Sequence, residues 1–362
     1  MDLITPRQVG KSHLEVTPLG FGGGPIGDRR VPMDTCLDTV RAAWDGGVRF
    51  FDTAPYYGIG RSERRIGTAL TECAAPGMFC INTKVGRTLE PEPFKNDSLK
   101  TFSPGGGVRT PRDGISGHRV HFDYAHDAIL KQHRDSLQRL GLPSVNSLAI
   151  HDIDFGHQHP DEIDLALRQL SRSGGGGALA LEGLRETGLI QAIGAGCNRE
   201  MRNYDSWDGG LQEDLIERIA DTVDLDFIIL AGPYTLLDTT ALHRVLPLCA
   251  TRQIGVIIAS PFAGGWLAAP ERISYMYGET PEHVVERTSK LQATCRDYDI
   301  ELAAVALQFP LAHPLVAAVI PGAKTPFEGA EAQRLLGVRI PGELWKTLKA
   351  QELLDPEAPV PI

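Results

Sequence analysis

Short apolar runs alternate along the chain with longer amphipathic segments. Eight of these runs have the length and residue types of strands that are buried in a parallel sheet. They are PLGFGG (18–23), VRFFD (48–52), MFCINTK (78–84), VNSLAIH (145–151), LIQAIGAG (189–196), DFIILAG (226–232), IGVIIAS (254–260) and LVAAVI (315–320). The pattern therefore predicts eight strands.

The segments between these runs have the spacing of amphipathic helices. The stretch MDTCLDTVRAAWDGG (33–47) ends in two glycines, which commonly terminate a helix. The stretch YAHDAILKQHRDSLQRLGL (124–142) places apolar residues along one side, among them Ile129 and Leu140. A strand followed by a helix, repeated eight times, predicts a (β/α)8 TIM barrel that residues 1–362 form as one domain.

A doubly wound sheet is the competing architecture for alternating strands and helices. Its dinucleotide-binding fingerprint, G-x-G-x-x-G, should follow the first strand and open a helix. The candidate GFGGGPIG (20–27) has a proline and further glycine there instead. The triplet GKS (10–12) resembles the end of a phosphate-binding loop, but the required glycine five positions earlier is Thr5. The barrel is therefore favoured.

Residues 86–121 have no steady hydrophobic period and are rich in Gly, Pro and Arg. They follow the third predicted strand, so the barrel architecture places them on the face where the strands end. An irregular loop of this length is usually functional or disordered, and this one is a candidate wall or lid of a substrate site. It offers Arg87, Arg109, Arg112 and His118 as polar contacts, although such residues are more commonly solvated.

The composition excludes several classes of protein. With 46 acidic and 36 basic residues the net charge is −10, which disfavours binding to nucleic acids and anionic membranes. No apolar run approaches the ~20 residues that span a bilayer, and the first residues lack the pattern of a secretory signal. The six cysteines form no C-x-x-C pair and no dense cluster. We expect a cytoplasmic protein that acts on a small molecule; the sequence leaves the oligomeric state open.

Three successive predicted strands end in ionisable residues. Asp52 ends the second strand, Lys84 the third and His151 the fourth, and Tyr57 follows Asp52 by five positions. Catalytic groups of barrel enzymes gather at this face, whereas three such residues in succession would be an unusual set of solvated strand ends. The pattern predicts a reaction centre.

The motifs around these residues resemble those of the aldo-keto reductase family. FFDTAPYYGIGRSERRIGTAL (50–70), INTKVG (81–86) and LAIHD (148–152) are similar to the family's segments that carry Asp and Tyr, Lys, and His. The resemblance covers nearly the whole chain and implies an aldo-keto reductase barrel with NAD(P)-dependent activity. LAGPYTLLD (230–238) and VRIPGELWKTLKAQELL (338–354) are most similar to the branch with D-threo-aldose (L-fucose) 1-dehydrogenases and a pyridoxal 4-dehydrogenase.

The chemistry of hydride transfer explains why these residue types would be needed. Hydride exchange between a nicotinamide and a carbonyl or alcohol carbon requires a proton donor or acceptor at the oxygen, and we assign this role to Tyr57. A free tyrosine has a pKa of ~10, too high for an efficient base, and the ammonium of Lys84 is expected to lower it. Asp52 would keep Lys84 charged and oriented, and His151 would donate a hydrogen bond to the substrate oxygen.

The resemblance also implies which residues bind the cofactor. Asn198, after the fifth predicted strand, matches the family's residue that holds the nicotinamide carboxamide, although Cys197 replaces the usual serine before it. The family's glutamine on the sixth strand is replaced by Ala231, and Ala259 stands where an aromatic residue often stacks on the nicotinamide, with Phe262 as a substitute. The further candidates are Gly22, Gly23, Asp52, Ser260, Gly322, Lys324, Thr325 and Glu328.

Residues 321–332 combine a turn with the start of a helix, whose free N–H groups suit a cofactor phosphate. The resemblance places Glu328 where NADP-using relatives often carry an arginine. A carboxylate there would repel a 2′-phosphate and could accept a hydrogen bond from a ribose hydroxyl, whereas Lys324 favours NADP. We therefore expect NAD as the cofactor, with NADP possible.

Several histidines and aspartates after the fourth strand invite a metal-site hypothesis. They are His151, Asp152, Asp154, His157 and His159. Their intervals match no established ligand spacing, and no second cluster completes a site, so we expect no metal and a solvated loop for the later histidines.

The expected function is oxidation of a small polyhydroxylated sugar at C1, such as L-fucose or another D-threo-aldose, or of a pyridoxal-like substrate. Two alternatives remain. One is a general aldehyde or ketone reductase that uses NADPH. The other is a non-catalytic barrel that acts as a binding subunit.

Overall fold

The main sheet of the protein contains eight parallel strands. The computed structural model describes residues 5–91, 117–198, 212–271, 275–277 and 280–361. The strands of this sheet are β3 (Gly20–Gly22), β4 (Phe50–Asp52), β5 (Cys80–Val85), β8 (Ser147–Ile150), β9 (Ala192–Asn198), β10 (Phe227–Ala231), β11 (Gly255–Ala259) and β12 (Val316–Ile320). Their spatial order follows their chain order, and parallel bridges from β3 to β12 close the sheet into a barrel. The predicted strands and the TIM barrel are confirmed.

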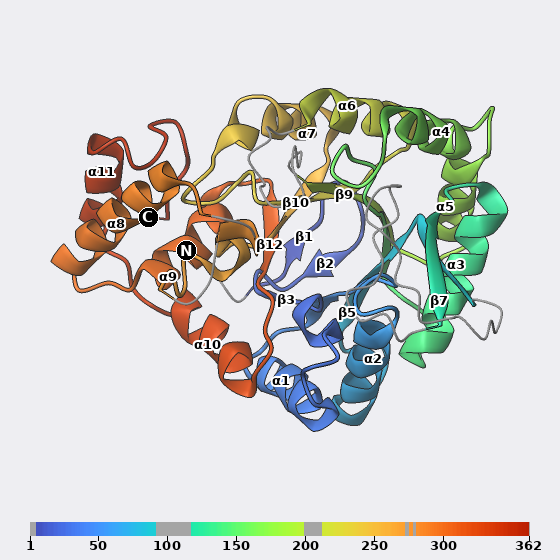
Figure 1. Ribbon diagram of the computed structural model, residues 1–362, viewed down its shortest axis with the longest axis horizontal. Helices are drawn as coiled ribbons and strands as arrows, with labels where there is room; N and C mark the ends of the chain where they lie inside the picture. The colour runs from blue at the N-terminus through green and yellow to red at the C-terminus, as the bar shows by residue number, and fades with distance from the viewer. Residues whose placement is uncertain (1–4, 92–116, 199–211, 272–274, 278–279, 362) are drawn as a thin grey trace.

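Helices cover the outside of the barrel (Figure 1). The α-helices are α1 (Met33–Asp45), α2 (Arg61–Cys73), α3 (His126–Leu140), α4 (Pro160–Leu170), α5 (Gly177–Glu186), α6 (Glu213–Thr222), α7 (Val245–Arg252), α8 (Glu282–Asp297), α9 (Leu302–Gln308), α10 (Pro326–Leu336) and α11 (Gly342–Ala350). Ile129 and Leu140 of α3 are buried, as their helical spacing predicts. Among the described residues, no helix combines the length and the apolar character that crossing a membrane requires.

A short hairpin closes the end of the barrel at which the strands begin. It consists of β1 (Arg7–Gln8) and β2 (Glu15–Val16), which pair in antiparallel fashion. Val9, Leu14 and Val16 of this hairpin pack in one cluster with apolar residues of the barrel strands. The amino end of the barrel is therefore filled with side chains.

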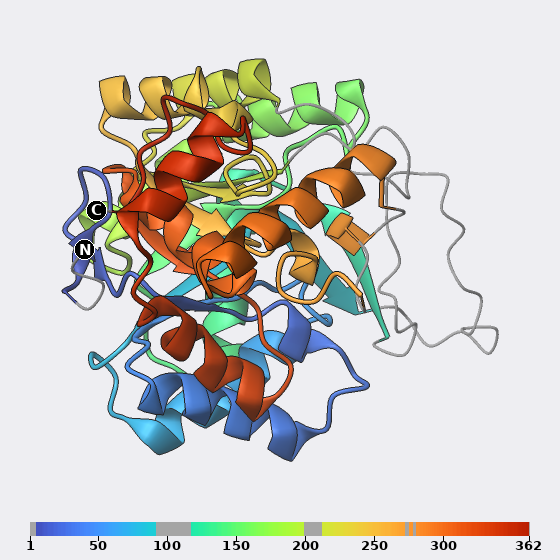
Figure 2. The ribbon, with the colours of Figure 1, turned by 90° about the vertical axis from the view of Figure 1, so that its left-hand side faces the viewer.

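An antiparallel arm extends from the opposite end. Strand β6 (Arg87–Pro91) pairs with β7 (His118–Phe122), and Leu89 and Val120 pack against Ile59. Figure 2 shows the hairpin in blue and the arm in cyan and teal at opposite ends of the molecule. The expectation that all of residues 86–121 form an irregular loop is wrong at both ends of this range, because the paired segments are far apart in sequence and have no local period. Arg109 and Arg112 lie outside the described residues.

The glycines at the barrel closure have a packing reason of their own. A Cβ on Gly22 would lie 2.8 Å from the carbonyl oxygen of Ile320, and one on Gly322 would lie 2.6 Å from Cγ of Pro25. A Cβ on Gly23 would lie 2.7 Å from the carbonyl oxygen of Asp52. The close approach of β3 to β4 and β12, and of Pro25 to Gly322, is thus sufficient to explain these glycines. Their predicted contact with a cofactor stays a prediction.

Candidate active site

The carboxyl ends of three neighbouring parallel strands bring the predicted ionisable residues together. Asp52 is the last residue of β4, Lys84 is the penultimate residue of β5, and His151 follows β8 directly. Tyr57 lies in the turn between β4 and α2 and is half-buried. All four are therefore at the end of the barrel from which the arm extends.

Lys84 and Asp52 form a buried ion pair. Nζ of Lys84 lies 2.7 Å from both carboxylate oxygens of Asp52 and donates to the carbonyl oxygen of Thr53 at 2.8 Å. Asn82 donates to Oδ1 of Asp52 at 2.7 Å, and Ser147 donates to Oδ1 of Asn82 at 2.8 Å. Burial alone would lower the pKa of Lys84, but Asp52 and Tyr57 together outweigh burial and raise it. Lys84 is therefore a fixed cation.

Tyr57 lies beside this cation. Nζ of Lys84 is 4.7 Å from the centroid of the Tyr57 ring, and the ring of His151 meets it edge-on, with 5.8 Å between centroids. Desolvation raises the pKa of Tyr57 to about 12, although the charge of Lys84 acts in the opposite direction. The expected lowering of this pKa is wrong for the protein alone, because burial and the negative charge of Asp52 outweigh Lys84.

His151 is a neutral imidazole. Burial lowers its pKa well below the ordinary value, and the charge of Asp152 does not offset this effect. Within the described part of the chain, Nδ1 of His151 has no hydrogen-bond partner, while Nε2 lies 3.4 Å from Oδ2 of Asp152. The hydroxyl of Tyr124 donates to the backbone carbonyl oxygen of His151 at 2.7 Å. A neutral ring held in this way can hydrogen-bond to a substrate oxygen.

Arg87, one of the polar residues that the sequence offered in the range 86–121, is buried beside the site. Its side chain is 2% exposed, and Nη1 donates to Oδ2 of Asp152. The guanidinium also lies 3.3 Å from the centroid of the Tyr56 ring and 5.1 Å from that of Phe122. The expectation that Arg87 is a solvated loop residue is wrong, because the β6–β7 pairing inserts it between aromatic rings and a carboxylate. His118, at the start of β7, is half-buried.

Asp152, Asp154 and His157 form a cluster behind His151. Potential ligand atoms of the three lie within 4.8 Å of one another. A hydrogen bond of 2.7 Å joins Nδ1 of His157 to Oδ1 of Asp154, and the His157 side chain is 10% exposed. The expected solvated loop is thus wrong for His157, whose pKa the two carboxylates raise against the effect of burial. His159 is exposed and caps α4.

The carboxylates of this cluster already have partners in the protein. Oδ2 of Asp152 accepts from Arg87, and the side-chain amide of Asn198 donates to Oδ1 of Asp152 at 2.9 Å and to Oδ2 of Asp154 at 2.8 Å. Burial would raise the pKa of Asp152, but its neighbours His151, His157 and Arg87 hold it well below its usual range. Because His151 is neutral, Arg87 is the permanent cation of the cluster, and His157 adds positive charge when it is protonated. The cluster is an ion-pair network.

Among the described residues, the contacts of Asn198 leave one atom of its side chain for a ligand. Both N–H groups of its amide are directed at aspartates, so only the carbonyl oxygen Oδ1 remains for a further hydrogen bond. Its neighbour Cys197 is buried, and burial raises the pKa of that thiol. An acceptor at the end of β9 fits the N–H2 group of a nicotinamide carboxamide.

The two candidates after β11 lie in an unusual backbone segment. Ser260 and Ala263 have φ angles of 52° and 50°, in the left-handed region. Non-glycine residues in this region are uncommon and concentrate at functional sites. Phe262 is half-buried and packs against the core. The structure thus places Ser260 and Phe262 at the expected end of the barrel.

The predicted phosphate site at the start of α10 is partly occupied by the chain itself. Thr325 caps the helix, and its Oγ1 accepts from the backbone N–H of Glu328 at 3.2 Å. The Glu328 carboxylate accepts from the backbone N–H of Lys324 at 2.6 Å. Glu328 therefore has a capping role, and its predicted contact with a ribose stays a prediction.

Comparison with known proteins identifies the family. The model of the aldo/keto reductase family matches residues 18–351. The chain belongs to the aldo/keto reductase family. It is 34% identical to pyridoxal 4-dehydrogenase of Microbacterium luteolum over 96% of this chain and 98% of that protein, and 33% identical to D-threo-aldose 1-dehydrogenase of a Pseudomonas species over 94% and 95%.

Solved structures support the same fold. Aldo-keto reductase AKR11C1 from Bacillus halodurans, in its holo form, superposes with a TM-score of 0.70 at 22% identity, covering 97% of both chains. Glycerol dehydrogenase AKR11B4 from Gluconobacter oxydans gives a TM-score of 0.66 at 20% identity, over 100% of this chain and 98% of the other. As an aldo-keto reductase, the protein is an oxidoreductase that uses NAD(P).

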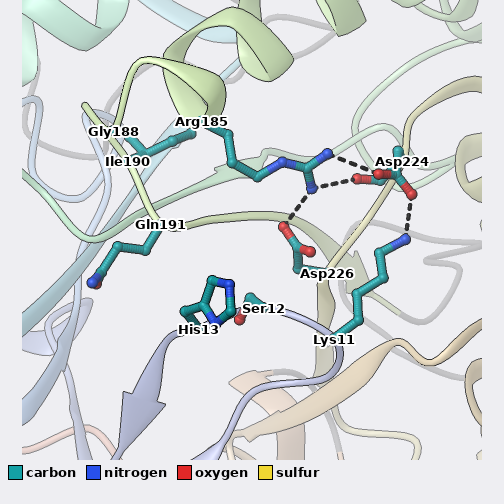
Figure 3. Close-up of a pocket in the computed structure, with 9 residues that line it drawn as sticks. All are labelled: Lys11, Ser12, His13, Arg185, Gly188, Ile190, Gln191, Asp224 and Asp226. Atoms are coloured by element: carbon teal, nitrogen blue, oxygen red, sulfur yellow. Dashed lines mark hydrogen bonds and ion pairs between the residues drawn. The ribbon is translucent and has the colours of Figure 1, made fainter.

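A pocket of about 440 Å³ lies at the other end of the barrel from these residues (Figure 3). Its lining comes from the β1–β2 hairpin and from the segments that precede β9 and β10. Its charged groups pair with one another: Lys11 with Asp224, and Arg185 with both Asp224 and Asp226. This pocket takes no part in the candidate active site.

Proposed function

We propose that this aldo-keto reductase is an NAD-dependent dehydrogenase that oxidises a polyhydroxylated sugar, such as L-fucose or another D-threo-aldose, at C1, or a pyridoxal-like compound. The observation that carries the proposal is the buried Lys84–Asp52 pair beside Tyr57, with neutral His151 against the same ring. The names of the two relatives at 33% and 34% identity support the substrate class.

The site residues have separate roles in the oxidation of a hydroxyl group. Such an oxidation removes a hydride from carbon and a proton from oxygen, and the nicotinamide, when bound, accepts the hydride. The phenolate of Tyr57 takes the proton, and the charge of Lys84 stabilises that phenolate. His151 orients the oxygen through a hydrogen bond.

The cofactor contacts follow from the same geometry. The carbonyl oxygen of Asn198 would accept from the nicotinamide carboxamide, since both of its N–H groups are engaged. The turn from Gly322 to Thr325 would hold a phosphate. The carboxylate of Glu328, at the first turn of α10, favours NAD over NADP because it repels a 2′-phosphate.

One observation favours a second candidate function, the reduction of aldehydes or ketones with NADPH. The pKa of Tyr57 is raised to about 12, so the phenol is protonated near neutral pH. A protonated phenol is the form that donates a proton to a carbonyl oxygen during reduction.

A two-direction assay separates these functions. NADH production would be measured with L-fucose, D-arabinose, L-galactose, pyridoxal and pyridoxine, each with NAD and NADP, and NADPH consumption with aliphatic aldehydes. We expect the highest kcat/KM for oxidation with NAD. Faster turnover of aliphatic aldehydes with NADPH would support the reductase instead.

Tyr57→Phe is the matched control for this assay, because it removes only the hydroxyl. The variant should still bind NADH in a fluorescence titration but lose turnover by about 10²–10⁴-fold, the usual contribution of a general acid or base. Wild-type protein that binds no nicotinamide would indicate a non-catalytic binding subunit.

A further inference from the structure

The ion pair between Asp152 and Arg87 has features that reduce the stability of the folded protein. The Asp152 and Arg87 side chains are 8% and 2% exposed, and Nε of Arg87 has no partner among the described residues. Asp152 also has a φ of 55°, in the left-handed region. A buried ion pair carries a large desolvation penalty, and a left-handed aspartate adds backbone strain. Neither feature lies at the bridges that close the barrel, Leu19 to Val319 and Gly22 to Gly322.

The pair is linked to the predicted cofactor contact through the side-chain amide of Asn198. Oδ2 of Asp152 accepts from Arg87, while its Oδ1 accepts from Asn198 at 2.9 Å. The other N–H of Asn198 is directed at Asp154 at 2.8 Å. A side-chain amide can usually turn over, exchanging its oxygen and nitrogen. Here a turned amide would face two carboxylates with its oxygen, so the negative charges exclude that orientation.

We propose that Asp152 is a positioning residue: held by Arg87, it locks the amide of Asn198 with its carbonyl oxygen free to accept from the nicotinamide carboxamide. Arg87 comes from the arm, Asp152 follows β8, and Asn198 ends β9, so three elements converge on this one orientation. The inference rests on the proposed function, because it requires a bound nicotinamide.

Asp152→Asn tests the charge without changing the shape. Asparagine has nearly the same size and also tolerates the left-handed conformation, so the backbone strain is not increased. Its own amide, however, can present either a donor or an acceptor to Asn198. With Asp152 neutralised, only the Asp154 carboxylate still opposes the turned orientation of Asn198, so its carbonyl oxygen is held less firmly toward the cofactor.

The readout is binding, not turnover. Reduced 3-acetylpyridine adenine dinucleotide lacks the N–H2 donor of NADH, so the ratio of the two dissociation constants reports the hydrogen bond to Asn198. We expect wild-type protein to bind NADH about tenfold more tightly than the analogue, as one hydrogen bond allows. In Asp152→Asn the ratio should fall to about half of the wild-type value or less.

Two further variants test the role of Arg87 and control for a general loss of stability. Arg87→Lys retains the charge but not the fixed fork of the guanidinium, and should give an intermediate ratio. Asp226→Asn makes the same chemical change in the buried pair with Arg185 at the other end of the barrel, and should keep the wild-type ratio.

The outcomes separate this inference from the proposed function. Wild-type protein that binds neither dinucleotide overturns the proposed function and this inference with it. Wild-type discrimination that persists in folded Asp152→Asn, or in folded Arg87→Lys should the first variant not fold, overturns only the positioning role of Asp152. Loss of discrimination in Asp226→Asn would also overturn it, because the effect would then be a general loss of stability.

Discussion

Each end of the barrel contains a buried aspartate paired with an arginine, but the hydrogen bonding around the two pairs differs. At the amino end, Oδ2 of Asp226 accepts from Arg185 at 2.7 Å and from the backbone N–H of Ile193 at 2.8 Å. At the carboxyl end, Asp152 pairs with Arg87, but Nε of Arg87 and Nδ1 of nearby His151 have no partner in the described part of the protein. Buried polar groups that are all hydrogen-bonded suit a closed end of the barrel. Buried polar groups without a partner next to a reactive phenol are suited to bind a ligand.

The backbone conformation also differs between the two ends of the barrel. Non-glycine residues in the left-handed region occur after the strands at Ile59, Asp152, Ser260 and Ala263. Before the strands, Gln253 adopts this conformation as the C-cap of α7, an ordinary helix ending. These four residues therefore accompany the candidate active site, where left-handed conformations of non-glycine residues are common.

The largest effect is expected for Lys84→Met. The substitution leaves Asp52 buried without its cation, which should lower the free energy of unfolding by about 3–5 kcal/mol. Without the ammonium beside Tyr57, turnover should fall by about 10²–10⁴-fold. Urea unfolding and initial rates of NADH formation would measure the two effects.

A double variant separates stability from catalysis in this experiment. Lys84→Met combined with Asp52→Asn removes both charges and should recover most of the stability while leaving turnover low. If the double variant regained turnover as well, the ion pair would only support the fold, and Tyr57 would act without Lys84.

The next effect concerns pH and the raised pKa of Tyr57. Oxidation needs the phenolate, and the fraction of phenolate rises about tenfold per pH unit below a pKa of about 12. With cofactor and substrate both below saturation, the oxidation rate should therefore rise about a hundredfold from pH 7 to pH 9, whereas the reduction rate should stay nearly flat. A plateau of oxidation below pH 8 would show that a different group accepts the proton.

The sequence predicted the barrel well because strands buried on both faces read as continuous apolar runs. It also placed Asp52, Lys84 and His151 together, since parallel strands all end at one face. The pKa of Tyr57 could not be predicted, because it depends on how burial, Lys84 and Asp52 balance in space. The same holds for Arg87, whose burial requires pairing between distant segments. One domain over residues 1–362 and a cytoplasmic location stay predictions.

A smaller effect is expected at the amino end, for Asp226→Asn. Arg185 would keep a hydrogen-bond acceptor but lose the charge of its partner, and its own side chain is 24% exposed, so water offsets part of the loss. We expect the free energy of unfolding to fall by about 1–3 kcal/mol in urea, with kcat/KM unchanged. A loss of kcat/KM would contradict the separation of the two ends.

The smallest effect is expected for Lys11→Met at the rim of the amino-end pocket. Lys11 pairs with Asp224, but their side chains are 31% and 50% exposed, and an exposed pair contributes only about 0–1 kcal/mol. The effect should disappear in high salt, since screening weakens exposed pairs most. Arg185→Met, which removes contacts with both Asp224 and Asp226, should cost more and depend less on salt. If Lys11→Met lowered the free energy of unfolding more than Arg185→Met, the exposed pair at the rim would stabilise this end of the barrel more than the buried aspartate does.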